Sequence, residues 1–242
     1  MPFSPPLFVI SSGIILLAFF VRALTGFGGA LIGVPLLALF LDLRSIVPLM
    51  TIFGLSIGLL LIKQVYQQVN FQALIPLALG VLVGSFLGSY FLRSFTNPVL
   101  KKVLGGIVVL YALNTFRPKD TKNRKLPPVV GIIAGLTSGA LGAMFGTSGP
   151  PIVMYLNRQL GKKENFRATL IGFFLIEMSI RTSAFALNRI FTLETIKTTL
   201  FLIPAFLVGI FLGNRVHTNI SQKKFKQIVA GLLLISGVML FK

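Results

Sequence analysis

The sequence predicts an all-α fold, a polytopic transmembrane helical bundle with two duplicated halves. Composition, a repeated motif and the placement of charge support this prediction. The chain has 242 residues, of which 55% are hydrophobic and 12% are charged, and its mean hydropathy is +0.90. The charged share is about half of that in soluble domains. Apolar runs near the length of a membrane span recur along the chain, which indicates a helical membrane protein.

Ten apolar segments are predicted to be helices. In the first half they are residues 6–24, 28–40, 46–63, 71–92 and 99–116. In the second half they are residues 128–141, 147–157, 167–187, 198–214 and 226–241. The most polar stretch separates the halves and is too short to hold a soluble domain. We therefore predict a first transmembrane repeat at 1–116, a basic cytoplasmic linker at 117–127 and a second repeat at 128–242.

A glycine-proline motif occurs once in each half. Residues 26–35 (GFGGALIGVP) return as residues 142–151 (GAMFGTSGPP) at an offset of 116. A second match pairs residues 84–88 (GSFLG) with 209–213 (GIFLG) at an offset of 125. Glycine and proline interruptions at matching places in two apolar halves indicate the binding site of a transporter. The structural alternative is that the small residues serve helix packing alone.

Residues 6–40 decide between two topologies. As one helix they would be about 50 Å long, which is too long for one span and too short for two. A broken hairpin that enters and leaves on the same side fits this length, and the two halves are then inverted. A single crossing would make the halves parallel. The basic loops 117–125 and 158–167 both read as cytoplasmic, so the loop charges favour inverted halves that each open with a hairpin.

Composition also excludes several classes of protein. The chain has no cysteine, which excludes disulfides and cysteine-ligated metals, and its single histidine excludes a histidine metal cluster. The net charge of +18 lies at the ends of apolar segments rather than in a stripe, so a nucleic-acid partner is not expected. We expect no cofactor, no metal and no catalytic residue. The expected partners are the lipid bilayer of the cell membrane and a small-molecule anion, and a homo-oligomer stays open.

The two breaks are predicted to line a polar cavity inside the membrane. Irregular backbone at membrane depth persists only where protein covers it or water reaches it. A helix that begins after such a break directs unpaired N–H groups toward the cavity, which suits an anion. Pro35, Pro150 and Pro151 are predicted to break the helices. The residues predicted to bind substrate at the breaks are Thr25, Gly26, Gly28, Gly29, Gly146, Thr147, Ser148 and Gly149.

Three charged residues lie inside apolar segments, namely Arg22, Glu177 and Arg181. Charge within a span is costly and suggests a functional role. Arg22 precedes the first break by about one helical turn, so it either binds substrate or caps a helix end. Glu177 and Arg181 are four residues apart and pair on one helix. They form either a structural ion pair, or a proton carrier (Glu177) and an anion ligand (Arg181).

These features make the chain similar to the sulfite exporter TauE/SafE family, also called the 4-toluene sulfonate uptake permease family. The resemblance rests on the paired motifs at 26–35 and 142–151, the small size, the duplicated halves and the near absence of large loops. The second motif departs from the family's run of glycines at Met144, Phe145, Thr147 and Ser148. The resemblance implies a secondary carrier of small sulfur-containing anions such as sulfite, thiosulfate or organosulfonates, and it leaves the direction of transport open.

The predicted function is therefore alternating-access transport of a small anion across the cell membrane. The substrate is expected near the membrane midplane between the two hairpins. The chain has no Walker-type sequence, so no ATP site is expected. A passive anion channel and a carrier of a non-sulfur organic anion are the alternatives. An intramembrane enzyme is not expected, because no span contains a metal motif or a serine-histidine pair.

Overall fold

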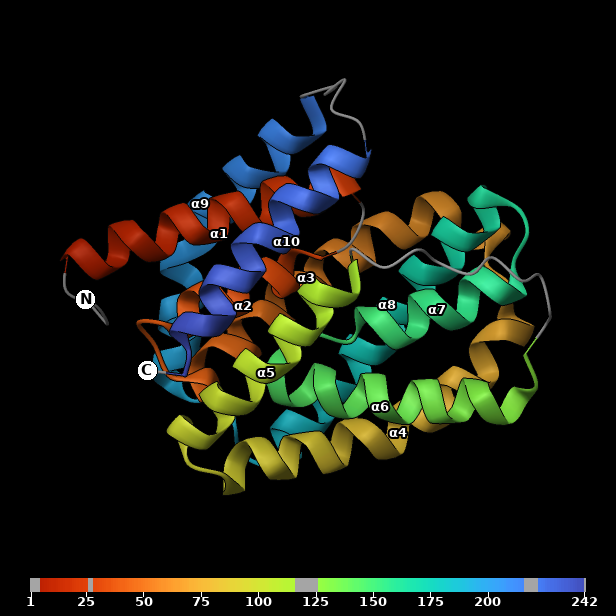
Figure 1. Ribbon diagram of the computed structural model, residues 1–242, viewed down its shortest axis with the longest axis horizontal. Helices are drawn as coiled ribbons and strands as arrows, with labels where there is room; N and C mark the ends of the chain where they lie inside the picture. Colours follow the sequence, from red (N-terminus) through yellow and green to blue (C-terminus); the bar gives the residue numbers. More distant parts are fainter. Residues whose placement is uncertain (1–4, 26–27, 116–125, 216–221, 242) are drawn as a thin grey trace. The chain divides into compact units, whose positions relative to one another are not determined.

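The computed structural model describes residues 5–25, 28–115, 126–215 and 222–241. Within these ranges the chain forms ten α-helices and no strand (Figure 1). The first half contains α1 (Pro5–Thr25), α2 (Gly29–Ala38), α3 (Leu43–Val65), the 3-10 turn η1 (Tyr66–Gln68), α4 (Phe71–Ser94) and α5 (Asn97–Thr115). The second half contains α6 (Pro128–Phe145), α7 (Gly149–Gln159), α8 (Lys163–Leu187), α9 (Leu193–Arg215) and α10 (Gln222–Met239).

The predicted all-helical membrane fold is confirmed. Each of the ten predicted apolar segments falls on one helix. Among the described residues, six helices are long and apolar enough to cross a membrane: α1, α3 with η1, α4, α6, α8 and α9. The apolar helix α2 has 10 residues, and it reaches about 15 Å, which is half of the hydrocarbon thickness. Helix length therefore distinguishes the spanning helices from α2 and α7, which have 10 and 11 residues and form the short second helices of the two broken hairpins.

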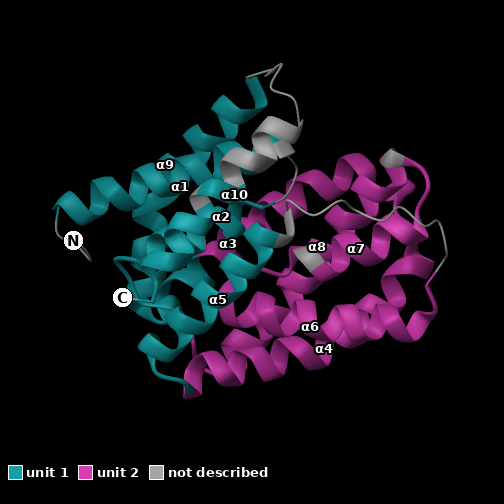
Figure 2. Cartoon of the chain, in the orientation of Figure 1, with its two compact units in different colours: residues 1–49, 95–119, 192–242 teal, residues 50–94, 120–191 magenta. Residues whose placement is uncertain are grey.

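The helices form two compact units, and each unit contains helices from both halves of the sequence (Figure 2). Unit 1 comprises residues 1–49, 95–119 and 192–242, and unit 2 comprises residues 50–94 and 120–191. Unit 1 holds α1, α2, α5, α9 and α10, unit 2 holds α4, α6, α7 and α8, and α3 contributes to both. The division at 117–127 concerns repeats along the sequence, and it stays a prediction.

In unit 2, α4 and α6 lie side by side with their glycines in contact (Figure 1). A Cβ at Gly84 of α4 would overlap the carbonyl oxygen of Leu136 on α6, and a Cβ at Gly88 would overlap that of Ala140. Only glycine permits this approach of two backbones, which is the packing expected of small residues in membrane helices. Because the contacts advance in the same direction on both helices, α4 and α6 are parallel.

The short helix α7 folds back along α6 in the same unit. The Tyr155 hydroxyl lies 2.8 Å from the position of a Cβ on Gly131, near the start of α6. Gln159 Nε2, at the end of α7, donates to the carbonyl oxygen of Leu126, 2.6 Å away. The α6–α7 hairpin therefore begins and ends on one side of unit 2, which is the shape that the sequence predicted for a broken segment.

Helix α8 runs parallel to α4. Near their starts, the Asn70 N–H donates to Thr169 Oγ1 at 2.9 Å. Near their ends, Asn188 Nδ2 donates to Ser89 Oγ at 2.8 Å. Since α4, α6 and α8 all contact one another, three parallel helices share one core in unit 2.

Unit 1 contains a second glycine contact of the same kind, between α1 and α9. A Cβ at Gly209 of α9 would lie 2.6 Å from the carbonyl oxygen of Leu16, and a Cβ at Gly213 would lie 2.6 Å from that of Phe20. These contacts also advance in one direction, so α1 and α9 are parallel. Helices α5 and α10 pack together in this unit as well.

Candidate functional site

The break between α6 and α7 consists of Gly146, Thr147 and Ser148. Gly146 follows α6 with a φ of 67°, and its N–H donates to the carbonyl oxygen of Gly142 at 2.8 Å. This left-handed conformation costs glycine no steric strain, so Gly146 ends α6 and redirects the chain. α7 then begins at Gly149, and the N-cap residue Ser148 makes no side-chain capping bond to it.

Two hydroxyl residues and two prolines lie at the start of α7. Pro150 and Pro151 occupy the first turn and carry no N–H, so two of the free donors expected at a helix start are missing. Thr147 and Ser148 are 4% and 3% exposed, and Thr147 Oγ1 has no hydrogen-bond partner among the described residues. An unsatisfied buried hydroxyl costs about 1–3 kcal/mol. The Thr147 hydroxyl is therefore poised to bind a solute or water.

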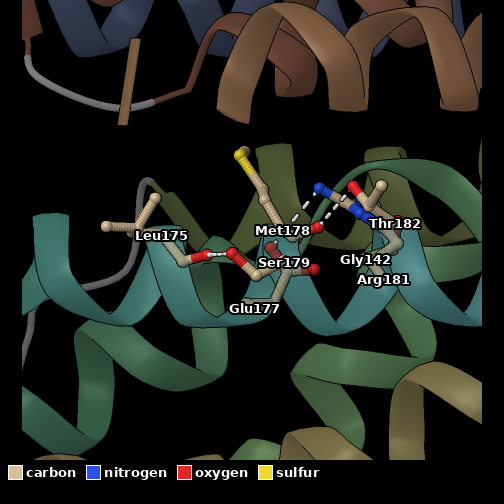
Figure 3. Close-up of polar contacts among 7 residues, drawn as sticks. All are labelled: Gly142, Leu175, Glu177, Met178, Ser179, Arg181 and Thr182. Atoms are coloured by element: carbon tan, nitrogen blue, oxygen red, sulfur yellow. Dashed lines mark hydrogen bonds and ion pairs between the residues drawn. The ribbon is translucent and has the colours of Figure 1, made fainter. Parts of the chain in front are cut away.

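A buried ion pair on α8 lies against this break (Figure 3). Arg181 Nη2 is 3.3 Å from Glu177 Oε2, and the two side chains are 2% and 0% exposed. Arg181 Nη1 donates to the carbonyl oxygen of Gly142, which also accepts the Gly146 N–H. The predicted pairing of Glu177 with Arg181 is confirmed. The guanidinium stands at the carboxyl end of α6, where the helix dipole favours a cation.

Gly142 provides the space for this pair. A Cβ at Gly142 would overlap Glu177 Oε1, and it would lie 3.0 Å from Ser148 Cβ and 3.3 Å from Arg181 Nη1. Three of the polar residues of the site thus surround one glycine. The sequence match aligned Gly142 with Gly26, but Gly142 lies inside α6 and the break follows about one helical turn later.

The break between α1 and α2, in unit 1, places an arginine beside glycines. Gly28 is the N-cap of α2 and has a φ of 90°. Arg22, in the last turn of α1, is 9% exposed, and its Cβ lies 3.1 Å from a Cβ position on Gly29. Its guanidinium carbon lies 5.9 Å from the centre of the Phe19 ring. The N–H groups of the first turn of α2 have no acceptor within the helix, so this break offers backbone donors next to a cation.

One predicted site residue has another role in the structure, and three others are not fully described. Gly26 lies outside the described residues, and so do the side chains of Thr25 and Pro150. Pro35 lies inside α2 and does not interrupt it, contrary to its predicted role. The positive φ of Gly28 makes the break, whereas a proline within a helix removes one hydrogen bond and is tolerated where packing compensates.

Sequence reasoning missed two polar residues of unit 2. Ser85 on α4 and Ser138 on α6 are fully buried, and neither hydroxyl oxygen has a hydrogen-bond partner among the described residues. The available signal was a serine next to a glycine in each span, at Gly84 and Gly139. Because serine is common at helix contacts in membranes, that signal did not distinguish packing from function.

The profile of the sulfite exporter TauE/SafE family matches residues 12–240. The chain belongs to this family. The resemblance that the motifs indicated is thus confirmed. A TauE/SafE protein is a membrane transporter, and together with the six helices of spanning length this confirms the predicted multi-pass location in a cell membrane.

Two curated relatives illustrate the family. The chain is 26% identical over 176 residues to the probable inner membrane transporter protein TsaS of Comamonas testosteroni. The alignment covers 72% of this chain and 74% of the relative. The chain is 24% identical over 178 residues to the probable sulfite/organosulfonate exporter TauE of Cupriavidus necator. That alignment covers 72% of this chain and 69% of the relative. No solved structure matches the chain.

Proposed function

We propose that this TauE/SafE protein is a secondary transporter that moves a small sulfur-containing anion, such as sulfite, thiosulfate or an organosulfonate, across the cell membrane by alternating access. The observation that carries the proposal is the α6–α7 break. It brings Ser148 and the buried Arg181 to one place around Gly142, and the residue before Ser148, Thr147, carries a buried hydroxyl with no hydrogen-bond partner among the described residues. Arg181 Nε also has no hydrogen-bond partner among the described residues.

The chemistry of these groups fits an oxyanion. A guanidinium carries N–H donors and no acceptor, and a threonine hydroxyl donates as well as accepts. In a site of low dielectric constant, such charge-assisted hydrogen bonds are roughly twice as strong as neutral ones. The family and the printed name of the Cupriavidus necator relative, a sulfite/organosulfonate exporter, support sulfur oxyanions as the substrate class.

Glu177 gives this site a means of proton coupling. While Glu177 is ionised, it neutralises Arg181 at 3.3 Å and competes with an incoming anion. Protonation of Glu177 would release the positive charge of Arg181 for the anion, so that anion and proton bind together. Replacement of Glu177 by Gln should therefore abolish the pH dependence of transport, and an unchanged pH dependence would refute this coupling.

Within the same proposal, the two halves are duplicated and inverted. Each half contains a broken hairpin and a helix with glycines on one face. The packing supports the equivalence of the halves, because α4 packs on α6 through its glycines and α9 packs on α1 in the same way. Helix α6 is parallel to α8, and α1 is parallel to α9. Consecutive spans of one chain cross a bilayer in opposite directions, so α8 and α9 are opposed, and α1 and α6 start from opposite sides. Substrate then reaches each hairpin from a different face of the membrane.

Thiol labelling tests the inversion. The chain has no cysteine, so Ser94→Cys introduces one thiol at the exposed end of α4, and Gly161→Cys introduces one into the exposed loop before α8. In sealed vesicles, inverted halves place these two thiols on opposite faces of the membrane. Labelling of both from the same face with an impermeant maleimide would support parallel halves instead.

Uptake into proteoliposomes tests the function. The panel comprises sulfite, thiosulfate, taurine, sulfoacetate, sulfate and lactate, each with and without a pH gradient. We expect saturable uptake of one or more of the sulfur anions above that of empty liposomes. Uptake of lactate alone would favour a non-sulfur organic anion, and flux that never saturates together with single-channel currents would favour a passive channel. Panel-wide uptake equal to that of empty liposomes would overturn the proposal.

A further inference from the structure

One face of α8 directs a line of polar and small side chains into the core of unit 2. Glu177, Arg181, Ala184 and Asn188 follow the spacing of a single helical face. Arg181 contacts α6 at the carbonyl oxygen of Gly142, and Asn188 contacts α4 at Ser89. This face of α8 therefore looks toward both α4 and α6, and the buried Ala184 leaves room between the polar residues.

The two buried serines occupy the facing surfaces of α4 and α6. Ser138 lies one turn before Gly142, on the same face of α6. Ser85 lies one turn before Ser89 on α4, and its backbone nitrogen lies 2.9 Å from a Cβ position on Gly139. Both serines thus lie in the three-helix core, opposite the polar face of α8.

Neither serine hydroxyl is satisfied by the protein within the described residues. Thr137 donates to the Ala134 carbonyl oxygen, which is the acceptor that a bond from Ser138 to the residue four before it would use. Leaving a buried hydroxyl unpaired costs about 1–3 kcal/mol, and such groups in proteins are commonly satisfied by buried water. By contrast, other hydroxyls in this unit donate to carbonyl oxygens of their own helices: Ser56, Thr137, Ser179, Thr182 and Ser183.

Polar contacts continue from these serines to one end of the unit. Asn188 Nδ2 donates to Ser89 Oγ at 2.8 Å, and Arg93 Nη1 lies 3.4 Å from the carbonyl oxygen of Asn188. Arg93 is exposed. Toward the starts of α4 and α8, the buried side chains are mostly apolar and include Leu77 and Phe173. The polar contacts of this core thus continue toward the carboxyl ends of α4 and α8, whereas apolar residues such as Leu77 and Phe173 come between them and the Thr169 hydroxyl near the starts.

We propose that water occupies a route through this core, from the Glu177–Arg181 pair along the buried serines and Asn188 to the aqueous phase at the carboxyl ends of α4 and α8. The unpartnered hydroxyls at Ser85 and Ser138 are the groups that this water satisfies. Because apolar residues lie on the other side of the ion pair, it exchanges water and protons with one side of the membrane. The inference concerns hydration of the protein, and it holds whichever solute the protein carries.

Thiol reactivity tests this route, because the chain has no cysteine of its own. Ser85→Cys and Ser138→Cys each place one thiol on the route. Ala134→Cys is the matched control, since Ala134 is buried one turn before Ser138 on the same face of α6, on the apolar side. Proteoliposomes receive Ag⁺, an ion small enough to follow water, and the remaining thiols are counted with a maleimide after denaturation.

We expect Ag⁺ to modify both serine positions at least about tenfold faster than Ala134→Cys, because thiolates form in water and not in an apolar core. Modification should be fast from the side of Arg93 and slow from the other side. Equal rates at all three positions would overturn the route, whatever the uptake panel shows, and equal rates from both sides would overturn its one-sidedness. If a serine variant fails to fold, Asn188→Cys and Ser89→Cys test the same route by the same criteria.

Discussion

The two hairpin breaks bring an arginine to the start of a short helix by different means. At the α1–α2 break, Arg22 belongs to the hairpin itself, and the first turn of α2 retains its N–H groups. At the α6–α7 break, Arg181 comes from α8 and is paired with Glu177, while two prolines lack the N–H groups of a first turn and the hydroxyls of Thr147 and Ser148 precede them. The first break thus offers backbone donors and the second offers side chains. Point substitutions can therefore remove individual donors at the second break.

Arg181, at the second break, provides the largest expected effect. Arg181→Gln removes the cation that lies 3.3 Å from the buried carboxylate of Glu177, and breaking a buried pair in this way costs about 3–5 kcal/mol. We expect Arg181→Gln to lower the melting temperature in detergent more than the glycine substitutions at either break.

The double variant Glu177→Gln/Arg181→Gln is the control for that prediction. It removes both charges and should recover most of the stability that Arg181→Gln loses, because the buried side chain at position 177 is then neutral. A double variant as unstable as Arg181→Gln would show that the ion pair is not the origin of the loss.

The next largest effect is expected when a glycine near the second break is replaced by alanine. Gly142→Ala would drive a methyl group into Glu177 and toward Ser148. Overpacking of this kind costs about 1–3 kcal/mol, so the variant should be less stable and should transport more slowly. Gly149→Ala is the matched control, since no atom lies within 4 Å of a Cβ there. Thermal melting of the two variants should differ, and equal melting temperatures would mean that the ion pair does not rest against Gly142.

A smaller effect is expected at the first break. Gly28 has a φ of 90°, and a left-handed conformation costs an L-residue with a Cβ about 1–2 kcal/mol. Gly28→Ala should therefore destabilise the α1–α2 hairpin, although no atom lies within 4 Å of the added methyl. Gly28→Asn should restore part of the loss because asparagine tolerates this conformation better. Equal stability of the wild type and Gly28→Ala, measured by melting, would mean that the break does not depend on backbone freedom.

Local patterns were sufficient to predict the helices and one side-chain contact. The apolar segments fell on the ten helices because membrane helices are defined by long runs without charge. The spacing of Glu177 and Arg181 predicted their ion pair because residues four apart on a helix are neighbours.

Contacts between distant segments could not be predicted in the same way. The matching glycines at 84–88 and 209–213 were visible as a repeat, but their partners, α6 and α1, depend on how the whole chain packs. The bond from Arg181 to the Gly142 carbonyl joins two helices and has no local signal. The role assigned to Pro35 was wrong because proline alone does not end a helix when packing supports it.

Anion binding by Thr147→Val tests the central claim most directly. Valine keeps the shape of threonine and removes the hydroxyl that has no partner among the described residues. Thr137→Val is the control, since the Thr137 hydroxyl donates only to carbonyl oxygens of its own helix. Titration calorimetry on purified protein measures the affinity for sulfite and thiosulfate. We expect Thr147→Val to weaken binding about tenfold, or about 1.4 kcal/mol, with a melting temperature no lower than that of the wild type, and Thr137→Val to bind as the wild type does. Wild-type affinity in Thr147→Val would contradict the assignment of the α6–α7 break as the anion site.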